Sequence, residues 1–493
     1  MYIGGLDVGT TGCKLSVYTD GGQFIYNSYK EYNVIRKNGE HEIDAEEIFS
    51  AVCQVLSDTA QKYSLAAVGV TTFGETFVLL DENDNVLLPS MLYTDPRGKA
   101  ECLKLCEALG EDTLTHISGV KPHSMYSLPK IMWIKNNLPD VYERIKRILL
   151  IEDYIIYKLC GAVQIDYSLA ARTMAFDIRK KCWSKEIFDA AGVDSSLMST
   201  PVPTGSVAGV IRSQLAKTLG ITTDIMIVNG AHDQIATTVG AGVFSVGEAV
   251  DGTGTVECVV PVFDKIPENK ELYDEGYSVV PYVFDGTYVC YALSFTGGAT
   301  LKWFRDNFAA KYKEENVYAQ LDASVPDAPT GILILPHFAG AANPFMDTGS
   351  RAAIVGLTLE SSAQDIYKAL MEGVSYEMMV NIEHLQHFGI TLERIYATGG
   401  GASSDVWLQI KADVWNRSVT SLEAKEVGAC GTCMLCGVAI GLYRDLQQAK
   451  QFFVKERNTY IPNEDTAEQY KKNYGAYCKM YGAVRPIVED VSK

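Results

Sequence analysis

The sequence predicts an α/β protein built from two related domains. Three observations support this prediction: the length of the chain, an alternation of strand-like and helix-like segments, and a strand–turn–strand pattern that occurs near the start and again near the middle. The first bears on the number of hydrophobic cores, the second on the fold class, and the third on the relation between the two halves.

The chain has 493 residues, whereas single hydrophobic cores stop growing near about 250–300 residues. Its 47% hydrophobic and 21% charged content is ordinary for a globular protein. We therefore expect two domains, residues 1–244 and 245–493, with the boundary where the strand–turn–strand pattern begins for the second time.

The formal net charge of −18 and the sequence pI of about 4.9 disfavour partners with phosphate backbones or anionic lipid surfaces. No apolar run is long enough to cross a bilayer, and the N-terminus has no basic region typical of a signal peptide. The 12 cysteines are scattered and fit reduced thiols. We expect a soluble, cytoplasmic protein that binds neither nucleic acid nor membranes.

Strand-like and helix-like segments alternate along the chain, as in α/β folds. Strands are predicted at Ala66–Val70, Met226–Val228 and Ile332–Leu335. Helices are predicted at Ala45–Ala60 and Ser361–Leu385.

Three cysteines spaced by three residues, Cys430, Cys433 and Cys436, form the one cluster that suggests a metal site. They lie in a run of small and apolar residues, Glu426–Gly441. Because free cysteine packs as a small hydrophobe, this run predicts a buried helix in preference to a metal site.

The repeated pattern consists of two Gly/Thr-rich turns, each between two strands. The first reads DVGTTGCK (Asp7–Lys14) and the second DGTGT (Asp251–Thr255). Such a turn can present backbone N–H groups to an anion, and a carboxylate such as Asp7 can hold Mg²⁺. The first turn alone also fits a plain hairpin, and it lacks Walker A spacing. Together the two turns favour a nucleotide held between two domains.

A third glycine-rich stretch, Thr398–Val414, follows an apolar strand and leads into a helix. Its serines and Asp405 suit the helix N-terminus, and its glycines allow close approach of a flat ligand. A plain strand-to-helix turn remains an equal alternative.

Asp233 is the candidate general base, because it follows the strand Asp224–Val228 at the edge where open α/β sheets bind ligands. With an ordinary pKa of about 3.9, it would be ionised at pH 7 and could accept a hydroxyl proton during phosphoryl transfer. A structural or capping role is the alternative. The neighbouring His232 fits a packed side chain better than a metal ligand, because no second ligand stands at suitable spacing.

These stretches together resemble the FGGY carbohydrate kinases over almost the whole chain. MYSLPKIMWIKNN (Met125–Asn137), with Lys130 and Trp133 in register, resembles the first family signature, and Ala352–Glu372 resembles the second, with Leu370 at a position usually held by a smaller or β-branched residue. The resemblance implies two ribonuclease-H-like domains of the actin-like ATPase fold with a central cleft. It also implies an ATP-dependent kinase that uses Mg²⁺, acts on a small sugar or polyol and forms a homodimer.

The resemblance assigns roles residue by residue. It implies that Asp7 holds Mg²⁺ through water and that Asp233 is the catalytic base. It implies nucleotide contacts for Thr10, Thr11, Lys14, Thr253, Gly298, Lys302, Gly400, Gly401 and Ser404. The family often has arginine at the position of Lys14 and serine at that of Gly12.

The substrate pocket is expected at Gly74, Glu75, Asp233 and Gln234. Glu75 and the Asp233–Gln234 pair resemble glycerol kinase, but the arginine that precedes this glutamate in that enzyme is replaced by Gly74, which would leave room for a larger substrate. An ionised Glu75 could accept hydrogen bonds from hydroxyl groups and would repel a sugar acid. We therefore expect a neutral ketose, either a pentulose such as xylulose or a hexulose, or a longer polyol.

Glycerol or gluconate kinase remains an alternative within the family, and an actin- or chaperone-like ATP-binding module is the alternative from another class. The two signatures and Asp233–Gln234 favour the kinase. Asp95 and Arg97 lie in a stretch that resembles a family Trp-x-Asp-x-Arg segment. They could contact the sugar or brace the cleft, and we favour the bracing role.

Overall fold

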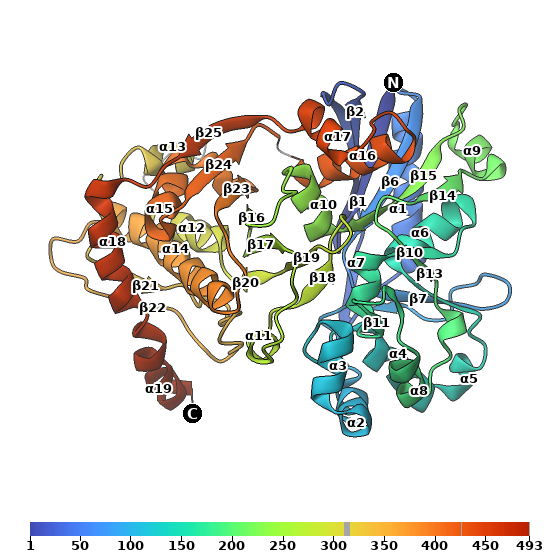
Figure 1. Cartoon of the computed structure of the whole chain (residues 1–493), viewed down its shortest axis with the longest axis horizontal. Helices are drawn as coiled ribbons and strands as arrows, with labels where there is room; N and C mark the ends of the chain where they lie inside the picture. Colours follow the sequence, from blue (N-terminus) through green and yellow to red (C-terminus); the bar gives the residue numbers. More distant parts are fainter. Residues whose placement is uncertain (310–315, 425, 493) are drawn as a thin grey trace. The chain divides into compact units, whose positions relative to one another are not determined.

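A computed structural model describes residues 1–309, 316–424 and 426–492. The chain forms two compact units (Figure 1). Unit 1 comprises Met1–Phe244, Ser278–Tyr288 and Glu426–Lys455, and unit 2 comprises Ser245–Tyr277, Val289–Lys425 and Glu456–Lys493. The long first segment ends at residue 244, but two segments from the second half of the sequence complete unit 1.

Unit 1 is organised around a six-stranded sheet with the order β14-β15-β6-β1-β2-β3. Strands β1, β2 and β3 are consecutive and antiparallel, whereas β6 runs parallel to β1 and β15 parallel to β6. The bounds of these strands are β1 Tyr2–Val8, β2 Gly12–Thr19, β3 Phe24–Glu31, β6 Leu65–Thr72, β14 Val207–Val210 and β15 Met226–His232.

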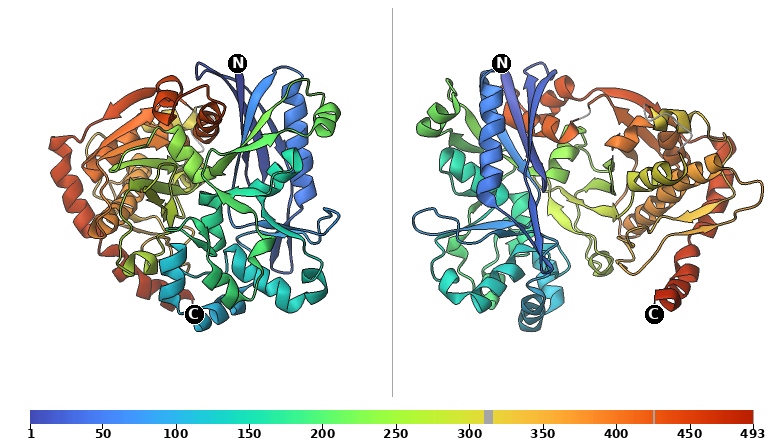
Figure 2. Two further views of the ribbon diagram at one scale, coloured as in Figure 1. Left: turned by 45° about the vertical axis from the view of Figure 1, so that its right-hand side comes forward. Right: turned by 180° about the vertical axis from the view of Figure 1, so that it is seen from behind.

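The alternation of side chains along β1 determines which residues face each side of this sheet. Leu6 and Val8 belong to the core that includes Ile48 and Val52 of α1 (Ala45–Ala60); this helix lies along the sheet in Figure 2. Gly5 faces the other side, where an added Cβ would lie 2.5 Å from the backbone oxygen of a residue in α16 (Val427–Ala439). Asp7, two residues further on, shares the face of Gly5.

The helix predicted at Glu426–Gly441 is confirmed as α16, and its three cysteines are fully buried. It packs closely on α10 (Asp233–Gly240), because a Cβ on Gly240 would lie 1.9 Å from the carbonyl oxygen of Val427. On α16, a Cβ on Gly431 would lie 2.0 Å from the carbonyl oxygen of Ala236. Glycines therefore bring the backbones of α10 and α16 into contact.

The remaining elements of unit 1 surround the sheet. They are β4 Val34–Lys37, β5 Glu40–Ile43, β7 Phe77–Leu80, β8 Ser90–Met91, α2 Lys99–Leu109, α3 Glu111–Ser118, α4 Ser127–Asn137, α5 Pro139–Tyr142, β9 Arg147–Leu150, α6 Ile151–Cys160, β10 Gln164–Asp166, α7 Tyr167–Ala170, η1 Ala171–Thr173, β11 Phe176–Asp177, β12 Cys182–Trp183, α8 Lys185–Ala191, η2 Ser195–Leu197, β13 Thr200–Val202, α9 Ser213–Leu219, β18 Val279–Pro281 and α17 Leu446–Phe453.

Unit 2 repeats the same topology in the strands β17-β16-β23-β24-β25. The hairpin β16–β17 is antiparallel, β23 runs parallel to β16, and β24 runs parallel to β23. An antiparallel hairpin followed by parallel strands on its first edge thus occurs in both units, which confirms the predicted α/β class and the ribonuclease-H-like, actin-like ATPase fold. The bounds are β16 Glu248–Thr253, β17 Glu257–Phe263, β23 Arg394–Thr398, β24 Ser418–Leu422 and β25 Glu456–Tyr460.

Helices α14 and α15 pack on each other beside this sheet (Figure 1). The predicted helix at Ser361–Leu385 is confirmed as α14, which starts with a capping box on Ser362 and Asp365. The other elements of unit 2 are α11 Glu271–Asp274, β19 Tyr288–Cys290, β20 Ala292–Ser294, α12 Gly298–Phe308, α13 Val317–Asp322, β21 Leu333–Leu335, β22 Ala353–Val355, α14 Ala363–His387, η3 Gly400–Ser403, α15 Asp405–Trp415, α18 Glu464–Tyr477 and α19 Met480–Ser492. In the described part of the chain, no helix has the length and apolarity needed to cross a membrane.

Candidate active site

Asp7 and Lys14 are partners across the first hairpin, in the register of β1 and β2. The Nζ atom of Lys14 lies 3.0 Å from each carboxylate oxygen of Glu426, the residue before α16. Burial raises the pKa of Asp7 to about 7; the negative charges of Asp233 and Glu426 act in the same direction, and Lys14 opposes them. Asp7, Lys14, Asp233 and Glu426 therefore form one electrostatic cluster.

The first turn itself is tight, because the Gly9 N–H donates to the Gly12 carbonyl at 2.9 Å. Thr10 is half-buried and Thr11 is exposed. At Gly12 an added Cβ would lie 2.6 Å from the hydroxyl of Tyr29. The tyrosine thus occupies the space in which the family serine would stand.

Asp233 is the first residue of α10, at the carboxyl end of β15, as the sequence predicts. Its Oδ1 accepts the backbone N–H of Gln234 at 2.6 Å and lies 3.3 Å from Nδ1 of His232. The side chain keeps 45% of its accessible surface, so solvent still reaches a carboxyl group that protein encloses on its other sides. That enclosure raises the pKa of Asp233 to about 6, against the lowering effects of the Gln234 N–H and the charge of Arg172. The ordinary pKa assumed from the sequence is wrong, although the group is still mostly ionised at pH 7.

Glu75 forms a buried ion pair with Arg172, which lies in η1. The Nε of Arg172 donates to Glu75 Oε1 at 2.6 Å, and its Nη2 contacts the same oxygen. The guanidinium also lies 5.2 Å from the ring centroid of Tyr126. The expectation of a carboxylate free to repel a sugar acid is wrong, because Arg172 compensates its charge.

The space expected at Gly74 is also filled. A Cβ there would lie 3.0 Å from Cγ of Arg172 and 3.2 Å from Cδ2 of His232. His232 is buried and neutral, because burial lowers its pKa to about 3 and Arg172 repels a proton. Gly74 therefore allows Arg172 and His232 to approach the chain and does not open room for a larger substrate.

The first family signature has a bracing role in this structure. Lys130, fully buried in α4, donates to the carbonyls of Asp95, at 3.0 Å, and Ser124. Arg97 binds the Asp95 carboxylate through Nε and Nη2, both at 2.8 Å, and lies 5.2 Å from the ring of Trp133. These contacts agree with the bracing role expected for Asp95 and Arg97.

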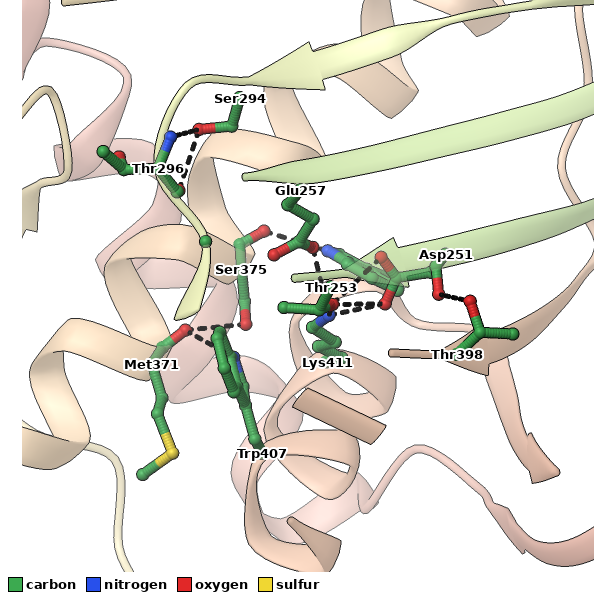
Figure 3. Close-up of polar contacts among 12 residues, drawn as sticks. Asp251, Thr253, Glu257, Ser294, Thr296, Met371, Ser375, Thr398, Trp407 and Lys411 are labelled. Carbon is green, nitrogen blue, oxygen red and sulfur yellow. Dashed lines mark hydrogen bonds and ion pairs between the residues drawn. The ribbon is translucent and has the colours of Figure 1, made fainter. Parts of the chain in front are cut away.

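In unit 2, the second turn joins β16 to β17 and exposes its tip, residues 254–256. Thr253 is 1% exposed, and its hydroxyl accepts Nζ of Lys411 at 2.6 Å and lies 3.3 Å from both carboxylate oxygens of Asp251. Figure 3 shows this hydroxyl directed toward Lys411. The Thr253 side chain therefore points into the core, and the exposed tip of the turn consists of Gly254, Thr255 and Val256.

The N-terminus of α12 is bound to this turn. The N–H of Gly298 donates to the Gly254 carbonyl at 2.8 Å, and the N–H of Ala299 to the Thr255 carbonyl at 3.2 Å. Lys302 lies one turn further along α12 with an exposed side chain.

The glycines of the third stretch lead into η3, and the following Ser404 caps α15 by accepting the N–H of Trp407 at 3.1 Å. A Cβ on Gly401 would lie 2.6 Å from Cγ2 of Thr253, whereas a Cβ on Gly400 would meet no atom within 4 Å. Gly401 is thus required for packing on the second turn, while Gly400 is open on its outer side.

Sequence reasoning missed four charged residues that the structure brings to these turns: Arg172, Glu257, Lys411 and Glu426. Only Lys411 has a local signal, because tryptophans four residues before and after it share its helix face. The other three depend on partners that are distant in sequence or on burial that the local sequence does not indicate.

Comparison with known proteins agrees with this arrangement. The pattern of the FGGY family of carbohydrate kinases, N-terminal domain, matches residues 2–240, and that of the C-terminal domain matches residues 272–440. Xylulose kinase of Bacillus subtilis is 26% identical over 489 residues, covering 97% of this chain and 96% of the relative. Gluconokinase of Bacillus licheniformis is 27% identical over 495 residues, covering 96% and 94%.

The crystal structure of ligand-bound xylulose kinase from Lactobacillus acidophilus superposes with a TM-score of 0.89 at 25% identity, covering 98% of both chains. Three findings thus point to the same family: the two domain patterns, the full-length relatives and the repeated fold that carries the glycine turns. The chain belongs to the FGGY family of carbohydrate kinases.

Proposed function

We propose that this carbohydrate kinase transfers the γ-phosphoryl group of ATP to a hydroxyl of a neutral ketose, a pentulose such as xylulose or a hexulose, or of a polyol, with Asp233 as general base. The observation that carries the proposal is the position of Asp233 at the carboxyl end of β15, partly exposed and in one electrostatic cluster with Asp7 and Lys14. A carboxylate with a pKa near 6 is still mainly ionised at neutral pH and is a stronger base than an ordinary aspartate.

The residues present fit ATP and Mg²⁺. Mg²⁺ usually takes one or two carboxylates and keeps several waters, and Asp7 offers one carboxylate; the described residues contain no cluster of three or more His, Cys, Asp or Glu that would form a closed metal cage. Bound Mg²⁺ would neutralise charge on the phosphates. Backbone near Gly400 and the exposed tip at residues 254–256 leave space for a nucleotide.

In the proposed arrangement Thr10, Thr11 and Lys14 contact phosphate from the first turn. Thr253 supports the second turn from within, since its hydroxyl is bound to Lys411. Gly298 and Lys302 of α12 and Gly400, Gly401 and Ser404 of the third stretch complete the nucleotide contacts.

A neutral substrate is supported by the similarity to xylulose kinases along the whole chain. Glu75, held by Arg172, and Gln234, in the first turn of α10, are proposed to bind its hydroxyl groups. Gluconate is a second candidate, because the Glu75–Arg172 pair carries no net charge to repel it and gluconokinases are equally similar.

Asp233→Asn tests the role of the base. We expect the variant to fold, to bind ATP and to lose about 10²–10⁴-fold in kcat, because it removes a general base without a change of size. Asp189→Asn, on an exposed helix face, is the matched control. Near-normal turnover of Asp233→Asn would remove Asp233 from the mechanism.

A coupled ADP-release assay across ketopentoses, ketohexoses, polyols, glycerol and sugar acids tests the substrate. The proposal expects the highest kcat/KM with a neutral ketose or polyol. ATP turnover that no sugar alters would instead favour the ATP-binding module.

We also propose a homodimer and a cytoplasmic location, both suggested by the family resemblance and the sequence. Light scattering after size-exclusion chromatography measures the first, and cell fractionation the second. A monomer at micromolar concentration, or recovery outside the cytoplasmic fraction, would contradict them.

A further inference from the structure

Lys411 is a fully buried lysine directly beneath the second glycine turn of unit 2. Its Nζ donates to Asp251 Oδ2 at 2.5 Å and to Thr253 Oγ1 at 2.6 Å, and it lies 3.0 Å from Glu257 Oε1. Burial alone would lower the pKa of a lysine, but the two carboxylates outweigh it and raise the pKa of Lys411. The ammonium is therefore a fixed positive charge under the turn.

Two tryptophans hold this ammonium from the sides. Trp407 and Trp415 stand one helical turn before and after Lys411 on α15, with their ring centroids 5.0 and 5.3 Å from Nζ. Their indole N–H groups donate to the carbonyls of Met371, at 3.2 Å, and Ser375, at 2.9 Å, on α14. Lys411 is thus tied to the sheet and to two helices (Figure 3).

Two carboxylates and one ammonium would carry a net charge of −1 if all were ionised. The charged groups that act on Glu257 are Lys411 on α15 and Asp251 on β16, while β20 faces it with the neutral Ser294. Burial raises the pKa of Glu257 to about 8, with Lys411 opposing and Asp251 adding to the shift. The raised pKa favours the protonated form of Glu257, which leaves Asp251 and Lys411 as a neutral pair.

Thr253 contacts the third glycine stretch, and the turn that follows it binds the N-terminus of α12. A Cβ on Gly399 would lie 2.6 Å from the Thr253 carbonyl oxygen, and one on Gly401 would lie 2.6 Å from its Cγ2. The first N–H groups of α12 bond to the next two carbonyls of the turn, those of Gly254 and Thr255. A displacement of Thr253 would therefore shift every segment of unit 2 that is proposed to contact the nucleotide.

We propose that Lys411 is a positioning residue for the nucleotide: it fixes Thr253 from below and cancels the charge of Asp251, so that the second turn can accept the phosphate groups of ATP. The inference rests on the proposed function, since it assumes that ATP binds at this turn. In this role Glu257 contributes only in its protonated form, because a second buried carboxylate would repel phosphate from below.

Calorimetric titration with ATP and Mg²⁺ tests the inference directly on the full chain. Lys411→Met should weaken ATP binding by roughly tenfold or more, because it leaves the Asp251 charge uncompensated near the phosphates. The KM for the sugar should stay within about twofold, since the sugar residues proposed above lie in unit 1.

The double variant Lys411→Met with Asp251→Asn removes both charges, and we expect it to recover most of the ATP affinity. If the single variant does not fold, the double variant can still be titrated with ATP. The matched control is Lys368→Met, which removes another buried lysine of unit 2, held by the carbonyls of Pro326, Asp327 and Ala328. We expect this control to lose stability but to bind ATP as the wild type does.

The pH dependence separates the charge effect from a merely structural one. Wild-type ATP affinity should fall above about pH 8, as Glu257 loses its proton. The Glu257→Gln variant should bind ATP normally at pH 7 and should not show that alkaline loss.

Two results would overturn the inference: an unchanged ATP affinity in a folded Lys411→Met variant, or an equal loss of affinity in Lys368→Met. Failure of the wild type itself to bind ATP would instead overturn the proposed function.

Discussion

Arg172 Nε lies 2.6 Å from Oε1 of Glu75, and both side chains are almost completely buried. Each of these charges would be costly to leave alone in the protein interior. Arg172 thus places a positive charge beside Glu75 from another segment of unit 1. The residue before Glu75 in the sequence, Gly74, carries no such charge.

Removal of one partner of this pair should destabilise the protein strongly. We expect Arg172→Met to lower the free energy of unfolding in urea by about 3–5 kcal/mol, and the double variant with Glu75→Gln to recover most of it. Lys185→Met, which breaks an exposed pair, should cost less than about 1 kcal/mol. A loss below about 1 kcal/mol in Arg172→Met would contradict a buried ion pair.

The acid limb of the pH–rate profile should report Asp233. Because its pKa is raised to about 6, the ionised base form is lost as the pH falls through 6, and kcat/KM should then fall about tenfold per pH unit. An acid limb with its midpoint near pH 4 would instead indicate an aspartate with an ordinary pKa.

Asp7, with a pKa of about 7, titrates in the same range. The double variant Arg172→Met with Glu75→Gln separates the two groups. The charge of Arg172 lowers the pKa of Asp233 and is not among the main causes of the shift at Asp7, so a limb due to Asp233 should move to higher pH in this variant.

The contact between α10 and α16 predicts that Gly240→Ala will be destabilising. A methyl group there would lie 1.9 Å from a backbone carbonyl, so the helices must separate, at a cost of about 1–3 kcal/mol or more. Gly475→Ala, in α18 with no atom within 4 Å of its Cβ, should instead stabilise by about 0.5–1 kcal/mol. Thermal denaturation compares the stability of the two variants. Equal changes in stability would contradict the close approach of α10 and α16.

The cysteines should separate into two classes in thiol titration of the native protein. Burial raises the pKa of Cys430 to about 12, and Cys433 and Cys436 share its helix and its burial. We expect these three to react only after unfolding, and the exposed Cys182 and Cys478 to react in the native protein. The double variant Cys182→Ser with Cys478→Ser should lose that fast phase, and rapid labelling of native Cys430 would contradict the buried helix.

Local patterns in the sequence predict the elements that depend on near neighbours. The hairpins around Gly9 and Gly254, the helices α1 and α14, and the place of Asp233 after a strand follow from glycine turns, apolar periodicity and caps within a few residues. The family signatures add the fold and the kinase activity.

The charges that surround the turns depend on contacts between distant parts of the chain. Glu75 and Arg172 are separated by 97 residues, Asp251 and Lys411 by 160, and Lys14 and Glu426 by 412. No periodicity extends over such distances, and whether a buried carboxylate is paired, protonated or free depends on what folding packs against it. The sequence by itself therefore determined the turns, the fold and the family, whereas the tertiary structure alone decided that Gly74 is filled, that Glu75 is neutralised and that the Thr253 hydroxyl points inward.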